Sequence, residues 1–196
     1  IADEPQSDIQ TSGDGDIALV FGGELTVTSF DSDAAGLLTD MGDITVVGPT
    51  ATLVAAIESI GGNITVEVVN DLTLEAKGNI KTSAAGIVSL TATAGDIDMQ
   101  QDSSIESGTG DIQLTSGGDL LLTRIVSGSG DVSLITGGRV LDNSIREFAN
   151  VETLGNLMIE SQKGVGLVTE DLDTAVSSMS VNNGAVGDIV IGQVGP

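Results

Sequence analysis

The amino-acid sequence predicts an all-β chain folded as a single-stranded parallel β-helix, a solenoid with three short strands in each turn of about 20–25 residues. Three observations favour this fold. A segment returns every twenty or so residues, apolar residues alternate within it, and glycine followed by a small polar residue precedes most strands. A single turn of a solenoid cannot bury its own apolar face, so the sequence repeats because each turn rests on another like it.

The repeat is clearest in residues 107–142. GDIQL at Gly110 returns as GDVSL at Gly130, and GGDLL at Gly117 returns as GGRVL at Gly137, each pair twenty residues apart. The earlier chain aligns to the same unit, whose first strands start 24, 24 and 20 residues apart. These first strands begin at Ile64, Val88, Ile112 and Val132. We therefore expect several turns of one architecture.

Alternation identifies the side chains that face the core. Residues two apart lie on the same side of a strand, so we expect Ile112, Leu114, Leu120 and Leu122 to point inward. Glycine permits the sharp corners between strands, and Asp or Asn bonds its own backbone in turns. The third strand of each turn has its own recurring pattern. It reads IKTSAAG, IESGTG and IVSGSG, beginning at Ile80, Ile105 and Ile125.

Two segments depart from the repeat. Residues 52–60 place apolar side chains at helical spacing, so a helix competes there with an insertion or a long strand. After Asp142 the alternation stops, and Ser144 with Glu147 fits a capping box for a short helical turn, with a loop as the alternative. We treat residues 1–196 as one β-helical domain.

Within this domain we expect regular turns over about 13–142 and looser, loop-bearing turns over 143–196. The chain opens on IADEPQ, without a Met or a signal peptide, which suggests a mature chain or a piece of a longer protein. It stops at GDIVIGQVGP, a fresh strand with no polar cap, and Ile189 and Ile191 lie in that strand.

Charge restricts the possible partners. The chain has 29 acidic and six basic residues, a net charge of −23. Nucleic acid and anionic lipid are poor partners for such a chain, whereas cations are attracted to it. Cys and His are absent, so disulfides and soft-metal sites are excluded. No apolar run approaches the ~20 residues of a membrane helix, so we expect no direct membrane insertion.

Acidic residues recur at equivalent corners and suggest a site for a hard cation. On stacked turns about 4.8 Å apart, neighbouring carboxylates repel by ~0.9 kcal/mol per pair even in water. Ca²⁺ prefers oxygen ligands and would relieve this repulsion. The alternative is a solvated acidic corner whose charges splay apart. The candidate Ca²⁺ ligands are Asp71, Asp96 and Asp119 on one corner and Asp111 and Asp131, which follow Asn63, on another. We expect no cofactor to be required.

Enzymatic chemistry receives little support from the residues. A glycoside hydrolase needs two carboxylates at a set separation, and 29 acidic residues nominate no particular pair. A lyase needs a basic residue as proton abstractor, and only six candidates exist. We therefore expect no enzyme and assign no catalytic residues.

The second half of the chain resembles a family. In order, it contains GDVSL, GGRVLD, LGNLMI, GVG, LDTAV and GDIVI, beginning at Gly130, Gly137, Leu154, Gly164, Leu172 and Gly187. This order is similar to the repeats of filamentous-haemagglutinin-like exoproteins and giant bacterial surface adhesins. The similarity covers about a third of the chain. It implies a right-handed β-helix, export from the cell and adhesive or scaffold roles. The chain contains no Arg-Gly-Asp, so the resemblance implies no receptor.

Together these observations predict an extracellular structural or adhesive β-helix at a bacterial cell surface, acting as a stalk, an adhesin segment or a filament subunit. Its expected partners are copies of itself or neighbouring repeats stacked end to end, and a host or cell-surface ligand. One alternative is a ligand- or calcium-binding surface module, with a receptor site on the irregular loop from Asp142 to Glu152. A β-helix enzyme that degrades polysaccharide is the more distant alternative.

Overall fold

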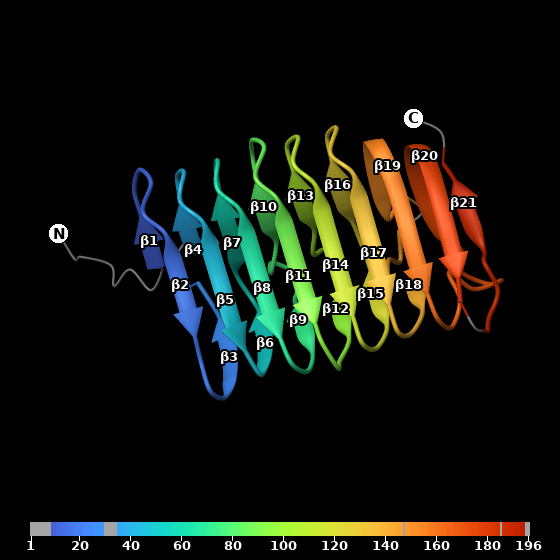
Figure 1. The fold of residues 1–196 in the computed structure, drawn as a ribbon, viewed down its shortest axis with the longest axis horizontal. Coiled ribbons are helices and arrows are strands. Elements are labelled where there is room, and N and C mark those ends of the chain that lie inside the picture. Colours follow the sequence, from blue (N-terminus) through green and yellow to red (C-terminus); the bar gives the residue numbers. More distant parts are fainter. Residues whose placement is uncertain (1–8, 30–34, 147, 185, 195–196) are drawn as a thin grey trace.

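The computed structural model describes residues 9–29, 35–146, 148–184 and 186–194. Every regular element in this part of the chain is a β-strand, and the strands stack as a parallel β-solenoid of about 7 turns (Figure 1). Each turn contributes three strands, so the predicted fold class is confirmed. The part of the chain that the structure describes contains no helix able to cross a membrane.

Three faces make up the solenoid. The first strand of each regular turn lies on the first face, and consecutive members pair in parallel. These strands are β2 (Ile17–Val20), β5 (Ile44–Gly48), β8 (Ile64–Val68), β11 (Val88–Ala92), β14 (Ile112–Ser116) and β17 (Val132–Thr136). The first strands thus begin at the positions that the repeat predicts.

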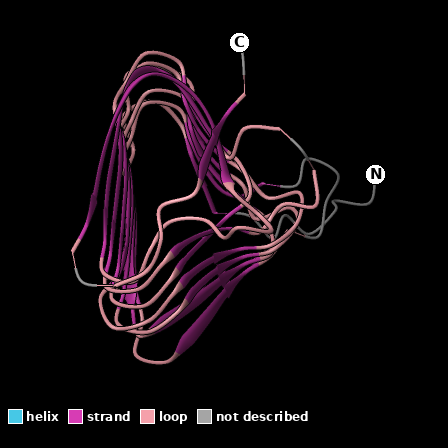
Figure 2. Ribbon diagram, turned by 90° about the vertical axis from the view of Figure 1, so that its right-hand side faces the viewer, coloured by secondary structure: helices cyan, strands magenta, loops and turns pink. Residues whose placement is uncertain are grey.

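The second and third faces are built in the same way. The second face holds β3 (Glu24–Val27), β6 (Thr50–Leu53), β9 (Leu72–Leu74), β12 (Ile97–Met99), β15 (Leu120–Leu122) and β18 (Val140–Asp142). The third face holds β1 (Ile9–Thr11), β4 (Ala35–Thr39), β7 (Ala56–Ser59), β10 (Ile80–Thr82), β13 (Ile105–Ser107) and β16 (Ile125–Ser127). Viewed along its length, the molecule has a three-sided outline (Figure 2).

The last turns have longer strands. β19 (Val151–Ser161) pairs with β16 through its first residues and with β17 through its last, so it runs from the third face onto the first. β20 (Leu172–Asn183) follows it, with an irregularity in the pairing between Thr153 and Asn156. β21 (Ile191–Gln193) pairs with the start of β20. The predicted loosening after Asp142 therefore changes strand length without ending the stack.

The core is a column of stacked aliphatic side chains. Ile64, Val88, Ile112 and Val132 are paired in register on successive turns, and all four are fully buried. Burying a large aliphatic side chain stabilises a fold by about 1.5–3 kcal/mol. All four side chains that we expected to point inward are also fully buried, which confirms that expectation. They are Ile112, Leu114, Leu120 and Leu122.

Residues 52–60 form no helix. They span the end of β6, a two-residue corner at 54–55, and β7. The backbone amides of both corner residues donate to the carbonyl of Val27, on the preceding turn. The alternation continues through the corner, so Leu53, Ala55 and Ile57 are all buried, whereas Ile60 is 52% exposed. The apolar residues at helical spacing therefore belong to two short strands and the corner between them.

The segment at 143–150 likewise contains no helix in its described residues. Ser144 closes a local turn instead, because its Oγ accepts a hydrogen bond from the amide of Arg146 at 3.1 Å. Its own amide donates to Asp142 Oδ1 at 2.6 Å. The loop alternative is therefore correct here, and Glu147 lies outside the described residues.

Candidate functional site

The corner between the third and first faces contains a column of buried hydroxyl groups. All but Thr153, which lies within β19, end a strand of the third face, and each one bonds to a glycine of the following corner. Ser127 Oγ lies 3.2 Å from the carbonyl oxygen of Gly110 and 3.0 Å from that of Gly130, which joins two successive turns. The buried members of this column are Thr39, Ser59, Thr82, Ser107, Ser127 and Thr153.

The glycines of this corner are required by close packing between turns. A Cβ on Gly110 would lie inside van der Waals contact of the carbonyl oxygen of Gly86. Gly130 stands in the same relation to Gly110. The glycine of the repeated Gly-Asp pair therefore marks the place where one backbone rests directly on the next.

The acidic residue after that glycine bonds to the neighbouring turn. Asp111 Oδ1 accepts the backbone amide of Asp131 at 2.8 Å. Asp131 Oδ1 in turn accepts the amide of Asn156 at 2.8 Å. Ile87 occupies the equivalent position one turn before Asp111 and interrupts the series, although its own amide donates to Asn63 Oδ1. These residues form the first Asx ladder.

A second Asx ladder follows the corner between the first and second faces. Asp71 Oδ1 accepts the amide of Asp96 at 3.0 Å, and Asp96 Oδ1 accepts the amide of Asp119 at 2.6 Å. Asp119 Oδ1 then accepts the amide of Arg139 at 2.7 Å. Hydrogen bonds to an ionised acceptor are stronger than neutral ones, so these carboxylates help to hold adjacent turns together.

The five predicted Ca²⁺ ligands therefore lie on two separate corners. Asp71, Asp96 and Asp119 follow one another on the second ladder, while Asp111 and Asp131 are neighbours on the first. Each gives one oxygen to a backbone amide, which provides a structural reason for its presence. Within the described ranges, no three acidic side chains gather closely enough to hold a metal ion. Calcium binding stays a prediction, tested below.

Two carboxyl groups on the second face have altered acidity. Burial raises the pKa of Asp98, and nearby Asp96, Glu75 and Asp71 add to the rise, against a hydrogen bond from Gln100. Burial also raises the pKa of Asp142, which accepts hydrogen bonds from the Ser144 amide and the Asn150 side chain. Asp142 continues an inward column otherwise formed by apolar residues such as Leu122.

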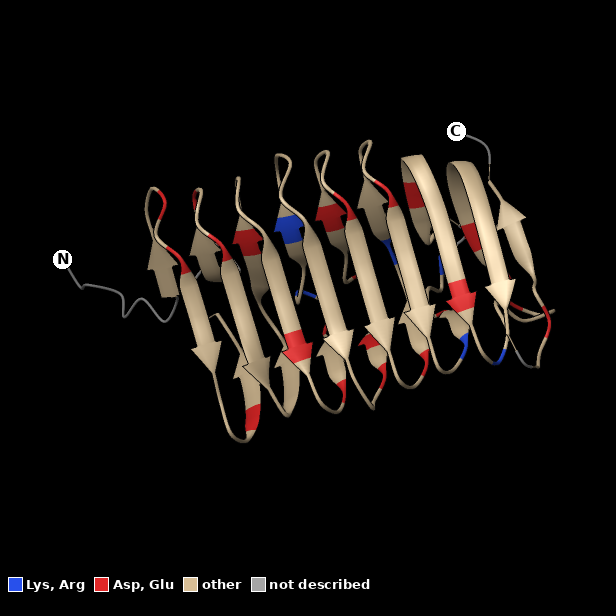
Figure 3. Cartoon of the chain, viewed as in Figure 1, with Lys and Arg blue, Asp and Glu red and all other residues tan. Residues whose placement is uncertain are grey.

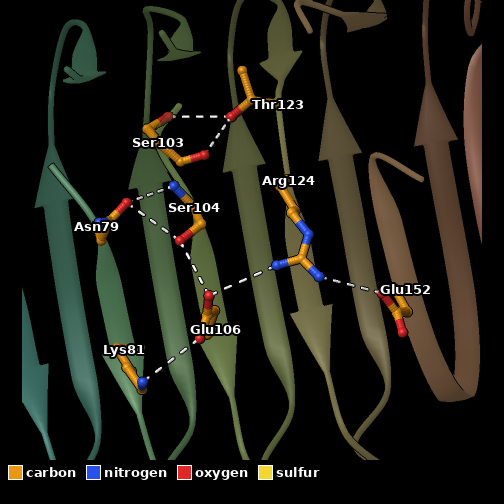
Figure 4. Close-up of polar contacts among 8 residues, drawn as sticks. All are labelled: Asn79, Lys81, Ser103, Ser104, Glu106, Thr123, Arg124 and Glu152. Carbon is orange, nitrogen blue, oxygen red and sulfur yellow. Dashed lines mark hydrogen bonds and ion pairs between the residues drawn. The ribbon is translucent and has the colours of Figure 1, made fainter. Parts of the chain in front are cut away.

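A row of alternating charges crosses the outer surface of the third face (Figure 4). Glu106 lies between Lys81 Nζ at 3.8 Å and Arg124 Nη1 at 3.9 Å. Arg124 Nη2 lies 3.5 Å from Glu152. Surface ion pairs of this kind each contribute about 0–1 kcal/mol, so this row does little for stability.

The repeat pattern did not predict this charged row. The available signal was the outward middle residue of three aligned strands, in IKT, IES and VET. In Figure 3, acidic positions are marked at many of the corners as well as in several strands. The first face is less charged, since its outward rows contain two acidic residues among the described strands, Glu67 and Glu160.

The two ends of the described stack have open strand edges. At the first end, β1, β2 and β3 each pair on one side, with β4, β5 and β6. At the other end, the last residues of β20 pair with β19 and with no further strand in the described chain. Large apolar side chains are exposed near both ends, including Val20, Met179 and Ile189.

No protein-family model matches this chain, and no curated protein or solved structure shows significant similarity to it. The geometry alone therefore places the chain in a structural class, the parallel β-solenoids.

Proposed function

We propose that the chain is an extracellular structural or adhesive β-solenoid at a bacterial cell surface, a stalk, adhesin segment or filament subunit, without enzymatic activity. The observation that favours this role most is the unbroken stack of turns. Buried aliphatic side chains run through the whole stack, and a hydroxyl column and two Asx ladders add hydrogen bonds between several of its turns. Such a stack resists bending. Few unpaired backbone amides are exposed along its faces, so a protease has little extended backbone to bind.

The pattern of Gly-Asp pairs and apolar alternation supports a finer assignment. It resembles the repeats of filamentous-haemagglutinin-like exoproteins, whose fold is of the same solenoid type. We propose membership of that group on this resemblance. The two carboxyl groups with raised pKa fit a structural role, because Asp98 and Asp142 are held by the side chains of Gln100 and Asn150.

The open ends support assembly along the axis. An unpaired strand edge is a template for pairing with another chain, and a head-to-tail contact that does not close produces a filament. The partner at each end is a neighbouring repeat of a longer protein or a second copy of this chain. The net charge of −23 disfavours other contacts between copies.

Antibodies raised against the purified chain test the location. We expect them to label intact cells of the producing organism, and we expect brief protease treatment of those cells to leave the labelled chain largely uncut. Labelling that appears only after lysis would contradict the proposal. An antibody against a cytoplasmic protein of the same cells is the control for leakage.

A further inference from the structure

The corners between the second and third faces differ in length, and this difference creates a notch in the side of the solenoid. Residues 100–104 form one long corner and the described residues of 143–150 lie in another, whereas the corner between them, at 123–124, has two residues. The long corners therefore project on either side of the short one. A cavity of about 220 Å³ lies above the short corner, between its two neighbours.

The two long corners meet across the notch and fix its shape. The amide of Ile145 donates to Gln101 Oε1 at 3.1 Å, and the Gln101 side chain donates to the carbonyl of Asn143. Arg146 Nη2 donates to Asp102 Oδ1 at 2.6 Å. Asp102 is the one non-glycine residue with positive φ, 68°, in the described chain. Backbone conformations of this kind are uncommon outside glycine, and clusters of them often mark functional sites.

The walls of the notch concentrate side chains that are rare in this sequence. Arg124 and Arg146, two of the six basic residues, both line it. So does Phe148, one of three aromatic residues, which is 40% exposed. The guanidinium carbon of Arg124 lies 6.0 Å from the centre of that ring, which orients both groups. Ser103 and Thr123 also line the notch, and Figure 4 shows their hydroxyl groups bonded to each other while the Arg124 guanidinium is directed toward Glu106 and Glu152.

The charged side chains around the notch indicate which class of ligand could bind there. Arg124 faces Glu106 and Glu152, and Arg146 is paired with Asp102, so two cations meet three carboxylates. An anionic ligand would be repelled by this local excess of negative charge and by the net charge of −23. Hydrogen-bonding capacity remains, since a guanidinium has five N–H donors and a carboxylate about four acceptor positions. A neutral ligand that both donates and accepts hydrogen bonds therefore suits the side chains that line the notch.

We propose that this notch binds a neutral saccharide. Neighbouring sugar hydroxyls would bond to the Arg146–Asp102 pair, which offers donors and acceptors side by side. The apolar face of the sugar ring would lie against the exposed part of Phe148. The site deepens the adhesive part of the proposed function and rests on it. It is separable from the rod-forming part, because the notch belongs to one copy of the chain and lies away from the open edges.

Saturation-transfer NMR on the whole chain tests the proposal, with methyl glycosides of glucose, galactose and N-acetylglucosamine as neutral probes and N-acetylneuraminic acid as the anionic probe. We expect at least one neutral glycoside to receive saturation. Arg146→Lys keeps the charge but loses the planar fork, and we expect it to weaken binding about tenfold or more without changing the melting temperature. Phe148→Ala should weaken binding similarly. Arg139→Ala, at an exposed arginine on another corner, should leave it unchanged.

Three results would overturn the proposal: no neutral glycoside receives saturation, the anionic sugar binds as tightly as the best neutral one, or binding survives both notch substitutions. Circular dichroism of each variant separates loss of the site from loss of the fold. Scattering from the same samples reports on end association, so a failure of the rod and a failure of the sugar site give different results.

Discussion

At the scale of single residues, close contact between backbones determines which positions tolerate change. In the Gly-Asp pairs that precede strands of the first face, Gly42, Gly110 and Gly130 face the glycine carbonyl of the turn before, so a methyl group has no room there. Other glycines are not constrained in this way. Gly23 has open space where a Cβ would lie, and its φ is not in the left-handed region.

Gly110→Ala and Gly23→Ala form a matched pair that tests this reasoning. We expect Gly110→Ala to lower the free energy of unfolding by about 3 kcal/mol or more, because the carbonyl of Gly86 cannot move without disturbing the stack. Gly23→Ala should change it by less than about 0.5 kcal/mol. Denaturant titration followed by circular dichroism measures both. Similar losses in the two variants would contradict the close-packing explanation.

Asp142 gives a pH-dependent prediction. Burial raises its pKa above the ordinary value of 3.8, so the folded chain binds this proton more readily than the unfolded chain. The charged group therefore costs stability at pH 7, and this cost disappears as the pH falls below its unfolded pKa. We expect Asp142→Asn, which keeps an acceptor for Ser144 and Asn150, to melt higher than the parent at pH 7.

The difference in melting temperature between parent and variant should shrink as the pH is lowered toward about 4. Comparing the two chains at each pH cancels the titration of the other carboxylates. A variant that melts lower than the parent at pH 7 would show that the charge of Asp142 is itself needed for its hydrogen bonds.

At the scale of elements, strand positions follow from the sequence far better than corner contacts do. Alternation and repeat spacing predict the starts of β8, β11, β14 and β17, because a core column requires the same side-chain phase on every turn. The contents of the corners follow less directly. Corner lengths vary between turns, and the notch depends on a short corner lying between two long ones. Only the stacking order reveals that arrangement.

For the acidic corners too, the sequence predicts which residues lie together but not the contacts that they make. Sequence alone groups Asp71, Asp96 and Asp119 on one corner, and the structure does place them in series. The sequence could not show that each carboxylate accepts a hydrogen bond from a backbone amide of the next turn, because that contact depends on the register between turns. The two uses of these carboxylates, bonding to backbone and binding Ca²⁺, are not exclusive, since each group has two oxygens.

Asp96→Asn separates these two uses. Asn keeps the acceptor for the Asp119 amide, as Asn63 does for Ile87, but it removes the charge. If the corner binds calcium, millimolar CaCl₂ should raise the melting temperature of the parent more than NaCl at matched ionic strength does. The variant should lose that extra increase. Equal effects of the two salts on the parent would leave the Asx ladder with its structural role alone.

At the scale of the whole molecule, a solenoid behaves as a one-dimensional array in which each turn contacts only its neighbours. Ile112 is fully buried between Val88 and Val132. We expect Ile112→Asp to place an unpaired charge in the dry column and to unfold the adjoining turns. Hydrogen exchange should show lost protection in β11, β14 and β17, with smaller losses toward the ends.

Exchange that is uniform along the chain would instead indicate one cooperative unit, and unchanged protection at β14 would contradict the inward position of Ile112. Gln113→Asp is the control, because this neighbouring side chain is exposed on the same strand. We expect it to alter exchange little.

We propose that copies of the chain, or neighbouring repeats, associate through their ends, and the dimensions of the chain in solution test this claim. Small-angle X-ray scattering of the purified chain over a concentration series reports length and cross-section separately. We expect length to grow with concentration at constant cross-section. We expect Ile189→Lys, in the isolated bridge before β21, together with Ile191→Lys, in β21, to stop that growth. A cross-section that grows instead would indicate side-by-side packing, for which the weakly charged first face is available. That result, or a parent chain that stays monomeric at every concentration, would contradict the claim.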